Sequence, residues 1–271
     1  MYLDKKNKEE VQFPDSPIYP RKTIQRVQSE LLKMASCVTE ILEKHEIPYL
    51  IAYGTLIGAI KFKGFLPWDD DIDFFLFDES YDEAIRYLEE EMPPELLVHG
   101  EKNDPNYFLA WNSVKNLEVE VQDNGIYNPD NKLLKFRCLG LDLYRLKKVS
   151  GSNLLKYKKD EARKFFKRKL EAKIIDQNCY QESVENLETL DAGSDLLDVQ
   201  GDLDYYTFVV KMKQPILPEA IFPLKRYRFE HLELLGPSDP MQVLSSSFDS
   251  LEELPPYEER KPHLSAVNFR T

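Results

Sequence analysis

Residues 64–74 read GFLPWDDDIDF, and this stretch carries the strongest functional signal of the sequence. It sets four carboxylates between a Pro-Trp pair and an apolar run that continues to Phe77: Asp69, Asp70, Asp71 and Asp73. A solvated acidic turn explains the first two. It does not explain Asp73 inside the apolar run, because burying an unpaired charge is costly. We therefore expect a buried strand over 72–77 whose leading carboxylates have a chemical task.

The spacing of these aspartates predicts how they are directed. Alternate side chains of a strand share a face, so Asp71 and Asp73 are expected to project together. Asp69 joins them if the strand begins that early, while Asp70 points the other way and braces the turn. Two carboxylates held side by side repel each other, and a divalent cation with oxygen ligands relieves this repulsion. The pattern therefore favours a metal ion on Asp71 and Asp73.

An apolar run at 49–53, predicted as a buried strand, ends in Gly54-Thr55. A short helix is expected directly after it, over 56–61. The backbone N–H groups at a helix N-terminus bind anions such as phosphate. A phosphate there and a metal ion on the aspartates would together form a phosphoryl-transfer site.

A third carboxylate is then needed from a neighbouring strand. Asp142 is flanked by Leu141 and Leu143 within a strand-like run at 136–146. An exposed residue on an edge strand explains Asp142 equally well. Its place at the site is therefore a hypothesis that the fold can test.

The whole chain has an ordinary globular composition. It has 271 residues, of which 42% are apolar and 31% charged, with a net charge of -12 and a pI near 5.0. The negative charge argues against non-specific binding of nucleic acid. No secretory signal is visible, and the uncharged stretch at 48–60 is shorter than the about 20 residues that span a bilayer. The three cysteines are widely spaced, which predicts a cytoplasmic protein without disulfides.

The order of elements predicts an α+β fold with a mixed β-sheet core flanked by helices and a mostly helical C-terminal half. We divide the chain into an irregular N-terminal arm (1–22), a core (23–150) and a C-terminal region that completes the substrate site (151–271). Helices are expected at 23–46 and, from a capping-box pattern of Ser80 and Glu83, at 80–91. Further strands are expected at 95–99, 107–115 and 117–123.

Residues 156–173 form a basic segment of the second half. They hold nine bases against three acids, with an apolar stripe that would dock the segment as a helix on the core. A solvated helix face explains the bases. The other interpretation is a peripheral contact with anionic headgroups at the inner face of the membrane.

The sequence resembles the LicD family, a phosphocholine-transferase-like group within the nucleotidyltransferase superfamily. The resemblance is carried by YGTLIGA (53–59) and GFLPWDDDID (64–73), and more loosely by the strand around Asp142 and by segments near 229–230 and 255–263. It departs from the family pattern at Phe62, where a His is usual, and at 143–145, where a Phe-Pro pair is usual. Both departures concern the acceptor side of the site.

The resemblance implies a nucleotidyltransferase-like core and a set of site residues. Asp71, Asp73 and Asp142 are the implied catalytic residues and ligands of Mg²⁺ or Mn²⁺. The implied substrate-binding residues are Gly54, Thr55, Lys61, Trp68, Asp70, Lys115, Arg260 and His263.

The resemblance also implies a reaction. A phospho-alcohol group, with phosphocholine as the best guess, would move from a CDP-activated donor to a sugar hydroxyl of a cell-surface glycan or teichoic acid precursor, and CMP would leave. The acceptor could be lipid-linked, and the chain's 32 aromatic residues (15 Tyr, 15 Phe and 2 Trp) are compatible with holding a choline cation. CDP-ribitol and CDP-glycerol are alternative donors. A non-enzymatic cation-binding scaffold of the same fold is the rival function.

Overall fold

The computed structural model describes residues 11–16, 19–123, 129–189, 204–206, 215–248, 251 and 253–270. Its helices are α1 (Arg21–Lys44), α2 (Tyr53–Phe62), α3 (Asp78–Glu91), α4 (Gly151–Glu171), α5 (Gln177–Thr189), α6 (Pro218–Ile221) and α7 (Pro240–Ser245), with 3₁₀ turns at Pro129–Leu133 and Tyr257–Glu259. Its strands are β1 (Tyr49–Ile51), β2 (Asp73–Phe77), β3 (Leu96–His99), β4 (Asn112–Asp123), β5 (Cys138–Val149), β6 (Asp204–Tyr206), β7 (Lys225–Phe229), β8 (Leu232–Gly236) and β9 (Leu264–Phe269).

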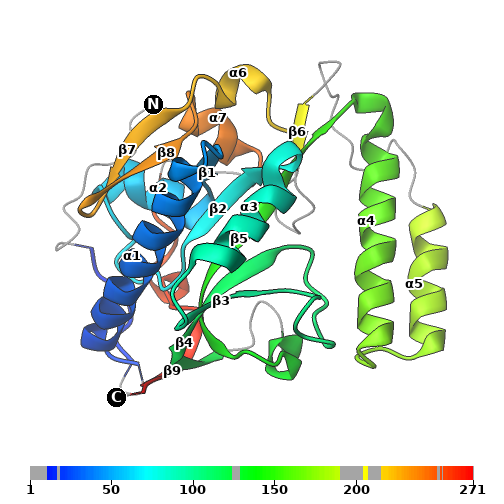
Figure 1. The fold of residues 1–271 in the computed structure, drawn as a ribbon, viewed down its shortest axis with the longest axis horizontal. Coiled ribbons are helices and arrows are strands. Elements are labelled where there is room, and N and C mark those ends of the chain that lie inside the picture. The colour runs from blue at the N-terminus through cyan, green and yellow to red at the C-terminus, as the bar shows by residue number, and fades with distance from the viewer. Residues whose placement is uncertain are drawn as a thin grey trace.

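A mixed sheet forms the centre of the molecule, with the strand order β1-β2-β5-β4-β3. Strands β2 and β5 are parallel, whereas β1 runs antiparallel to β2, and β4 antiparallel to β5. Strand β6 pairs with β5 and β9 pairs with β4, and a separate hairpin joins β7 to β8. This arrangement confirms the predicted mixed sheet flanked by helices (Figure 1).

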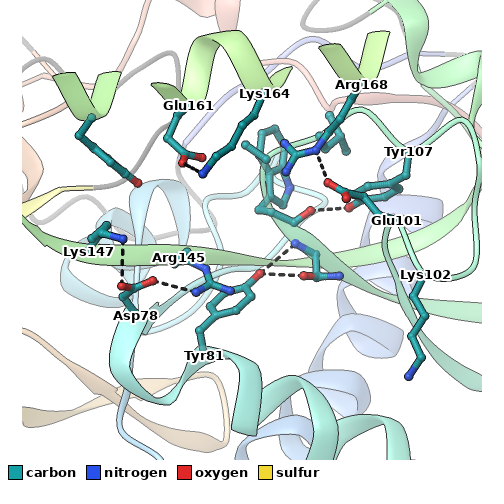
Figure 2. Close-up of a pocket in the computed structure, with 15 residues that line it drawn as sticks. Asp78, Tyr81, Glu101, Lys102, Tyr107, Arg145, Lys147, Glu161, Lys164 and Arg168 are labelled. Atoms are coloured by element: carbon teal, nitrogen blue, oxygen red, sulfur yellow. Dashed lines mark hydrogen bonds and ion pairs between the residues drawn. The ribbon is translucent and has the colours of Figure 1, made fainter. Parts of the chain in front are cut away.

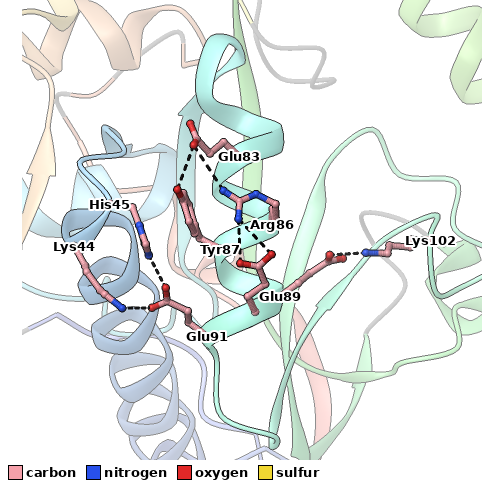
Figure 3. Close-up of polar contacts among 9 residues, drawn as sticks. Lys44, His45, Glu83, Arg86, Tyr87, Glu89, Glu91 and Lys102 are labelled. Carbon is pink, nitrogen blue, oxygen red and sulfur yellow. Dashed lines mark hydrogen bonds and ion pairs between the residues drawn. The ribbon is translucent and has the colours of Figure 1, made fainter.

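Strand β2 is buried along its whole length, which explains why its sequence is a continuous apolar run after Asp73. Helices α1 and α3 contact each other and both contact β5. The apolar stripe of α1 faces the core, and its C-terminal end is held against α3 where Lys44 and His45 both pair with Glu91 (Figure 3). The site-bearing strand thus lies inside a packed core rather than at an edge.

The structure corrects the predicted start of α3. The helix begins at Asp78, and Ser80 does not cap it; instead the Ser80 hydroxyl donates weakly to the Phe77 carbonyl at 3.4 Å. Two acids, Asp78 and Glu79, occupy the first turn, where negative charge interacts favourably with the helix dipole. The capping-box prediction was therefore wrong at this end.

Two predicted strands also differ from the structure. The segments 107–115 and 117–123 form one strand, β4, which begins at Asn112 and shifts register between Asn116 and Glu120. A β-bulge of this kind interrupts the alternation of side chains, which makes one strand look like two in the sequence.

The C-terminal half contains the long helices α4 and α5, as expected, and also strands that the sequence pattern did not predict. Strand β9 adds to the central sheet beside β4, so residues near the C-terminus return to the core. Figure 1 shows α4 and α5 packed against each other to one side of the sheet. None of the helices in the described ranges has the length and apolar character needed to cross a membrane. The domain boundaries at 22/23 and 150/151 stay predictions.

Candidate active site

Asp73 and Asp142 lie side by side on parallel strands. They are register partners across β2 and β5, and the Asp142 N–H donates to the Ile72 carbonyl at 2.9 Å. Neighbouring strands are about 4.8 Å apart, so the two carboxyl groups share one end of the sheet. The interpretation of Asp142 as a remote edge residue is therefore excluded.

The Asp142 carboxylate is held by two hydroxyl groups. Ser113, its register partner on β4, donates to Oδ1, and Tyr144 donates to Oδ2 at 3.2 Å. Burial raises the pKa of Asp142, and the nearby Lys115 ammonium opposes this rise. Sequence reasoning missed Ser113 and Tyr144, because only the pairing of β4 with β5 brings Ser113 to the site.

Asp69 and Asp73 are buried carboxyl groups, and few nearby positive charges offset the cost of burying them. Burial raises the pKa of both well above the usual value, and the nearby charge of Asp71 raises each further. One oxygen of Asp69, Oδ2, is buried and has no hydrogen-bond partner among the described residues. A cluster of carboxyl groups is thus held together at a cost in free energy.

Asp71 is paired with His263, which comes from the segment just before β9. The His263 Nδ1 atom lies 2.6 Å from Asp71 Oδ2. Burial alone lowers the pKa of His263, but the charges of Asp71, Asp69 and Asp70 outweigh it and raise this pKa to about 11. His263 is therefore an imidazolium at neutral pH, and it supplies positive charge to the cluster.

Asp70 is directed toward the same C-terminal segment. Its two oxygens accept the backbone N–H groups of His263 and Leu264 at 2.8 and 3.0 Å. Burial raises the pKa of Asp70 to about 6. These contacts make Asp70 a brace between the aspartate turn and β9. The sequence predicted a bracing role, because Asp70 was expected to point away from Asp71 and Asp73.

Gly54 and Thr55 border the aspartates from α2. Strand β1 ends at Ile51 and α2 already begins at Tyr53, so both residues lie in the first turn of the helix rather than at the strand end. A Cβ on Gly54 would lie 2.8 Å from Asp69 Oδ2, so only glycine leaves that carboxylate its space. Gly54 therefore borders Asp69, whereas Thr55 beside it contacts Asp73.

The Thr55 hydroxyl accepts the backbone N–H of Asp73 at 2.9 Å and is almost fully buried. We expect Thr55→Val, which keeps the shape but leaves that N–H without an acceptor, to lower the free energy of unfolding by about 1–3 kcal/mol. Chemical denaturation measures the change. Thr55→Ser keeps the hydroxyl and is the matched control. Equal losses of unfolding free energy in the two variants would mean that this hydrogen bond does not contribute to stability.

The loop that leads into the aspartates is clamped from the β7–β8 hairpin. The N–H of Glu230 donates to the Lys63 carbonyl at 2.6 Å, and its side chain accepts the N–H of Phe65 at 3.3 Å. A Cβ on Gly64 would overlap the Glu230 carboxylate, and the rings of Phe65 and Phe229 pack 4.7 Å apart. These contacts bring the segment at 229–230 against the start of the aspartate-bearing stretch, although the two are far apart in the sequence.

Three other predicted binding residues, Trp68, Arg260 and Lys61, differ in how far they are buried. Trp68 is buried, and the Arg260 guanidinium lies 5.7 Å from its ring. Arg260 also donates to the carbonyls of Pro255 and Gln12, so it supports the chain around the site. Lys61 is half-buried in the last turn of α2.

Lys115 lies closer to the carboxylates. Its charge lowers the pKa of Asp142, and its side chain packs over Gly140, where a Cβ would lie 2.4 Å from Nζ. Buried Gln28 of α1 also reaches the site and donates to the Asp69 carbonyl at 2.8 Å. Gln28 was not predicted, since it falls on a helix that the pattern assigned to packing.

The donor set suits a hard divalent cation, which prefers carboxylate oxygens. The unpartnered oxygen of Asp69 and the space left by Gly54 agree with this chemistry. Within the described part of the chain, however, no group of three or more His, Cys, Asp or Glu side chains already stands in a metal-binding arrangement. Asp71 is hydrogen-bonded to His263 and Asp142 to Ser113, so a metal ion would share these carboxylates with the two partners.

Comparisons with known proteins agree with this geometry. Residues 46–137, which span β1, α2 and β2, match the family model described as LicD/FKTN/FKRP, nucleotidyltransferase domain. The lipopolysaccharide cholinephosphotransferase LicD of Haemophilus influenzae is 41% identical over 59 residues, which is 22% of this chain and 22% of that protein.

Two uncharacterised rickettsial proteins are also similar. RP689 of Rickettsia prowazekii is 27% identical over 124 residues (39% of this chain, 45% of that protein), and RT0683 of Rickettsia typhi is 21% identical over 238 residues (88% and 52%). The chain thus spans about half or less of the length of these three relatives. Residues 46–137, which carry the aspartate turn, thus match the nucleotidyltransferase domain of the LicD/FKTN/FKRP family, and this match together with the similarity to LicD supports membership of that family.

Proposed function

We propose that this protein is a transferase that moves a phospho-alcohol group, most readily phosphocholine, from a CDP-activated donor to a sugar hydroxyl of a glycan. The acceptor would be a cell-surface polysaccharide or teichoic acid precursor, which could be lipid-linked, and CMP would be released. The similarity to a cholinephosphotransferase supports the choice of donor. Ribitol phosphate and glycerol phosphate are the alternative groups, because the phosphate chemistry is the same.

One observation carries the proposal: Asp73 and Asp142 are register partners, with Asp69 and Asp71 close enough to raise the pKa of Asp73. A cation-binding scaffold without catalysis would not need Asp142 at the same end of the sheet. Buried carboxyl groups with raised pKa values are common at catalytic sites, because their arrangement is retained for chemistry despite its cost.

The residues have separate roles in the proposed reaction. Asp71, Asp73 and Asp142 would hold Mg²⁺ or Mn²⁺, which when bound offsets charge on the donor's phosphates and on the leaving CMP. Asp142 is either one of these ligands or the base that takes the proton of the acceptor hydroxyl. Its two hydroxyl partners fix its orientation in both cases. The first turn of α2 would face the phosphate oxygens.

A panel of CDP-choline, CDP-ribitol, CDP-glycerol and CDP-ethanolamine tests this function. We expect CMP release from one donor in excess of the others, and we expect release to stop when a chelator removes divalent cations and to return when Mg²⁺ or Mn²⁺ is added. CMP release that is unaffected by a chelator would contradict the metal assignment. A protein that binds the cation but releases CMP from no donor would favour the scaffold.

We also propose a cytoplasmic location with a peripheral contact between residues 156–173 and the inner face of the membrane. Several bases of this segment already pair with acids, among them Arg163 with Asp160 and Lys169 with Asp130, which reduces the attraction. We expect replacement of Lys156, Lys159 and Lys167 by Gln to weaken binding to anionic vesicles several-fold, since each base near a charged surface contributes about 1 kcal/mol at most. Donor hydrolysis should not change. Equal vesicle binding by both proteins would reject the contact.

A further inference from the structure

A cavity of about 440 Å³ lies between the sheet and α4, apart from the aspartate cluster (Figure 2). Tyr81 of α3 and Arg145 of β5 line one side, and Lys164 and Arg168 of α4 line the other. Its volume is within the range of pockets that hold small molecules. None of the four site aspartates lines it, so nothing in the proposed transfer site accounts for it.

The lining of this cavity carries an excess of positive charge. Five cationic side chains border it against three carboxylates. One of these carboxylates, Asp78, is shared by Arg145 at 2.8 Å and Lys147 at 3.3 Å, and Arg145 also pairs with Asp82 outside the lining. The cavity therefore favours an anionic group over a cation.

Two of the four aromatic rings in the lining, those of Tyr81 and Tyr157, are already covered by cations. The Arg145 guanidinium lies 4.1 Å from the centre of the Tyr81 ring, and the Lys147 ammonium lies 5.7 Å from that of Tyr157. An ammonium cage needs open aromatic faces and local negative charge. The cavity is thus unsuited to the choline group.

Arg168 offers a donor that nothing in the described chain uses. Its Nε pairs with Glu101, whereas its Nη1 is buried and has no hydrogen-bond partner among the described residues. A buried guanidinium N–H without an acceptor is costly, and a ligand oxygen would remove this cost. Lys164 lies one helical turn away on the same wall of the cavity, where it pairs with Glu161 at 2.6 Å, so a ligand anion would share Lys164 with that carboxylate.

Two aromatic side chains connect the cavity to the proposed catalytic carboxylate. Trp111 lines the cavity, and its ring lies 4.9 Å from that of Tyr144. The Tyr144 hydroxyl donates to Asp142. A molecule seated beside Trp111 would therefore stand next to the residue that holds Asp142.

We propose that this cavity is an acceptor subsite for an anionic sugar, which Arg168 and Lys164 hold by a phosphate or carboxylate while its hydroxyl groups lie toward Trp111. The inference rests on the proposed transferase function and adds the chemical class of the acceptor. It also assigns a task to α4, the helix that closes the cavity.

The test follows the indole N–H signals of the tryptophans in the ¹⁵N–¹H spectrum. The chain has two tryptophans, and Trp111 is the one in the cavity. The signal that disappears in Trp111→Phe is therefore that of Trp111. The probes are the 6-phosphates of glucose, galactose and mannose, each with its parent sugar, and glucuronate and inorganic phosphate. No CDP donor is present. The variants are Arg168→Gln and Lys164→Gln, with Lys167→Gln as a control that changes the same charge on the same helix outside the cavity.

We expect at least one sugar phosphate or glucuronate to shift the Trp111 signal saturably, with an affinity about tenfold or more above that of its parent sugar. Arg168→Gln and Lys164→Gln should weaken this binding about tenfold, and Lys167→Gln should not change it. The proposal is overturned if no probe shifts the signal, if sugar and sugar phosphate bind equally, or if Arg168→Gln binds like the control. Inorganic phosphate that binds as tightly as the sugar phosphates would overturn the acceptor role.

This binding assay is independent of turnover. If the signal shifts but no donor releases CMP, the transferase proposal fails and the subsite stands as a sugar-anion site alone. If CMP is released but the signal does not shift, the subsite fails and the transferase proposal stands.

Discussion

Asp73→Asn lowers the rate of group transfer by about 100-fold or more while the protein stays folded. The substitution keeps the shape of the side chain and removes its charge at the point where β2 and β5 bring Asp73 and Asp142 into register. Transfer in the proposed mechanism depends on that charge, because it helps to hold the cation that offsets the donor's phosphates. CMP release under saturating donor measures the effect.

The design of this experiment separates chemistry from folding. Asp73 lies in a fully buried strand, so circular dichroism and thermal unfolding must accompany the rate. Asp142→Asn should reduce transfer comparably, although donor binding persists if Asp142 acts as the base. Asp82→Asn is a suitable control, since Asp82 is a largely exposed aspartate on α3 that pairs with Arg145 away from the cluster. A folded Asp73→Asn protein that transfers at the wild-type rate would show that the aspartate cluster is not the metal site.

Asp69→Asn and Asp78→Asn change stability in opposite directions. Asp69 is buried, its Oδ2 atom has no hydrogen-bond partner among the described residues, and burial and the charge of Asp71 raise its pKa. Removing this charge should increase the free energy of unfolding of the metal-free protein by about 2 kcal/mol at pH 7. Asp78 instead pairs with Arg145 and Lys147, which hold its pKa below the usual value despite partial burial. Its replacement should cost about 1 kcal/mol.

The two substitutions also differ in their dependence on pH. The pKa of Asp69 is higher in the folded state than in the unfolded state, so the folded protein binds more protons, and stability from this group is lost as the pH rises above about 4. The gain from Asp69→Asn should therefore grow from pH 4 to pH 8. The pKa of Asp78 is lower in the folded state, so its contribution is present at neutral pH and disappears as the pH falls below about 4. Urea denaturation across this range measures both, and a gain from Asp69→Asn that does not depend on pH would refute the account.

The sequence predicted the parts of the fold that depend on neighbouring residues. The stripe of α1 has the helical period of 3.6, and β2 is a short continuous apolar run; both are local patterns, so their positions were expected to within a few residues. Strand β4 was predicted as two strands because its bulge breaks the period, and α3 begins before Ser80 because the acids of its first turn replace a cap.

The candidate site was less accessible to sequence reasoning, because its contacts join distant segments. Asp71 and His263 are 192 residues apart, and only the family resemblance, not the residue pattern, pointed to His263. Ser113 reaches Asp142 through a strand pairing that no local signal encodes. The contact between Gly54 and Asp69 has a similar cause, since the loop between α2 and β2 folds back and places Asp69 against α2.

The return of β9 to the central sheet has a consequence for the order in which the site is made. Synthesis proceeds from the N-terminus, and domains begin to fold as they emerge. The strands that gather the aspartates, β1, β2 and β5, are complete by Val149, whereas His263 and the backbone donors that bind Asp70 come more than a hundred residues later. On the ribosome, a sheet of β1, β2 and β5 that forms before β9 is made would hold the acidic cluster without the imidazolium that faces it. The protein reaches its working charge balance only when the last strand has paired with β4.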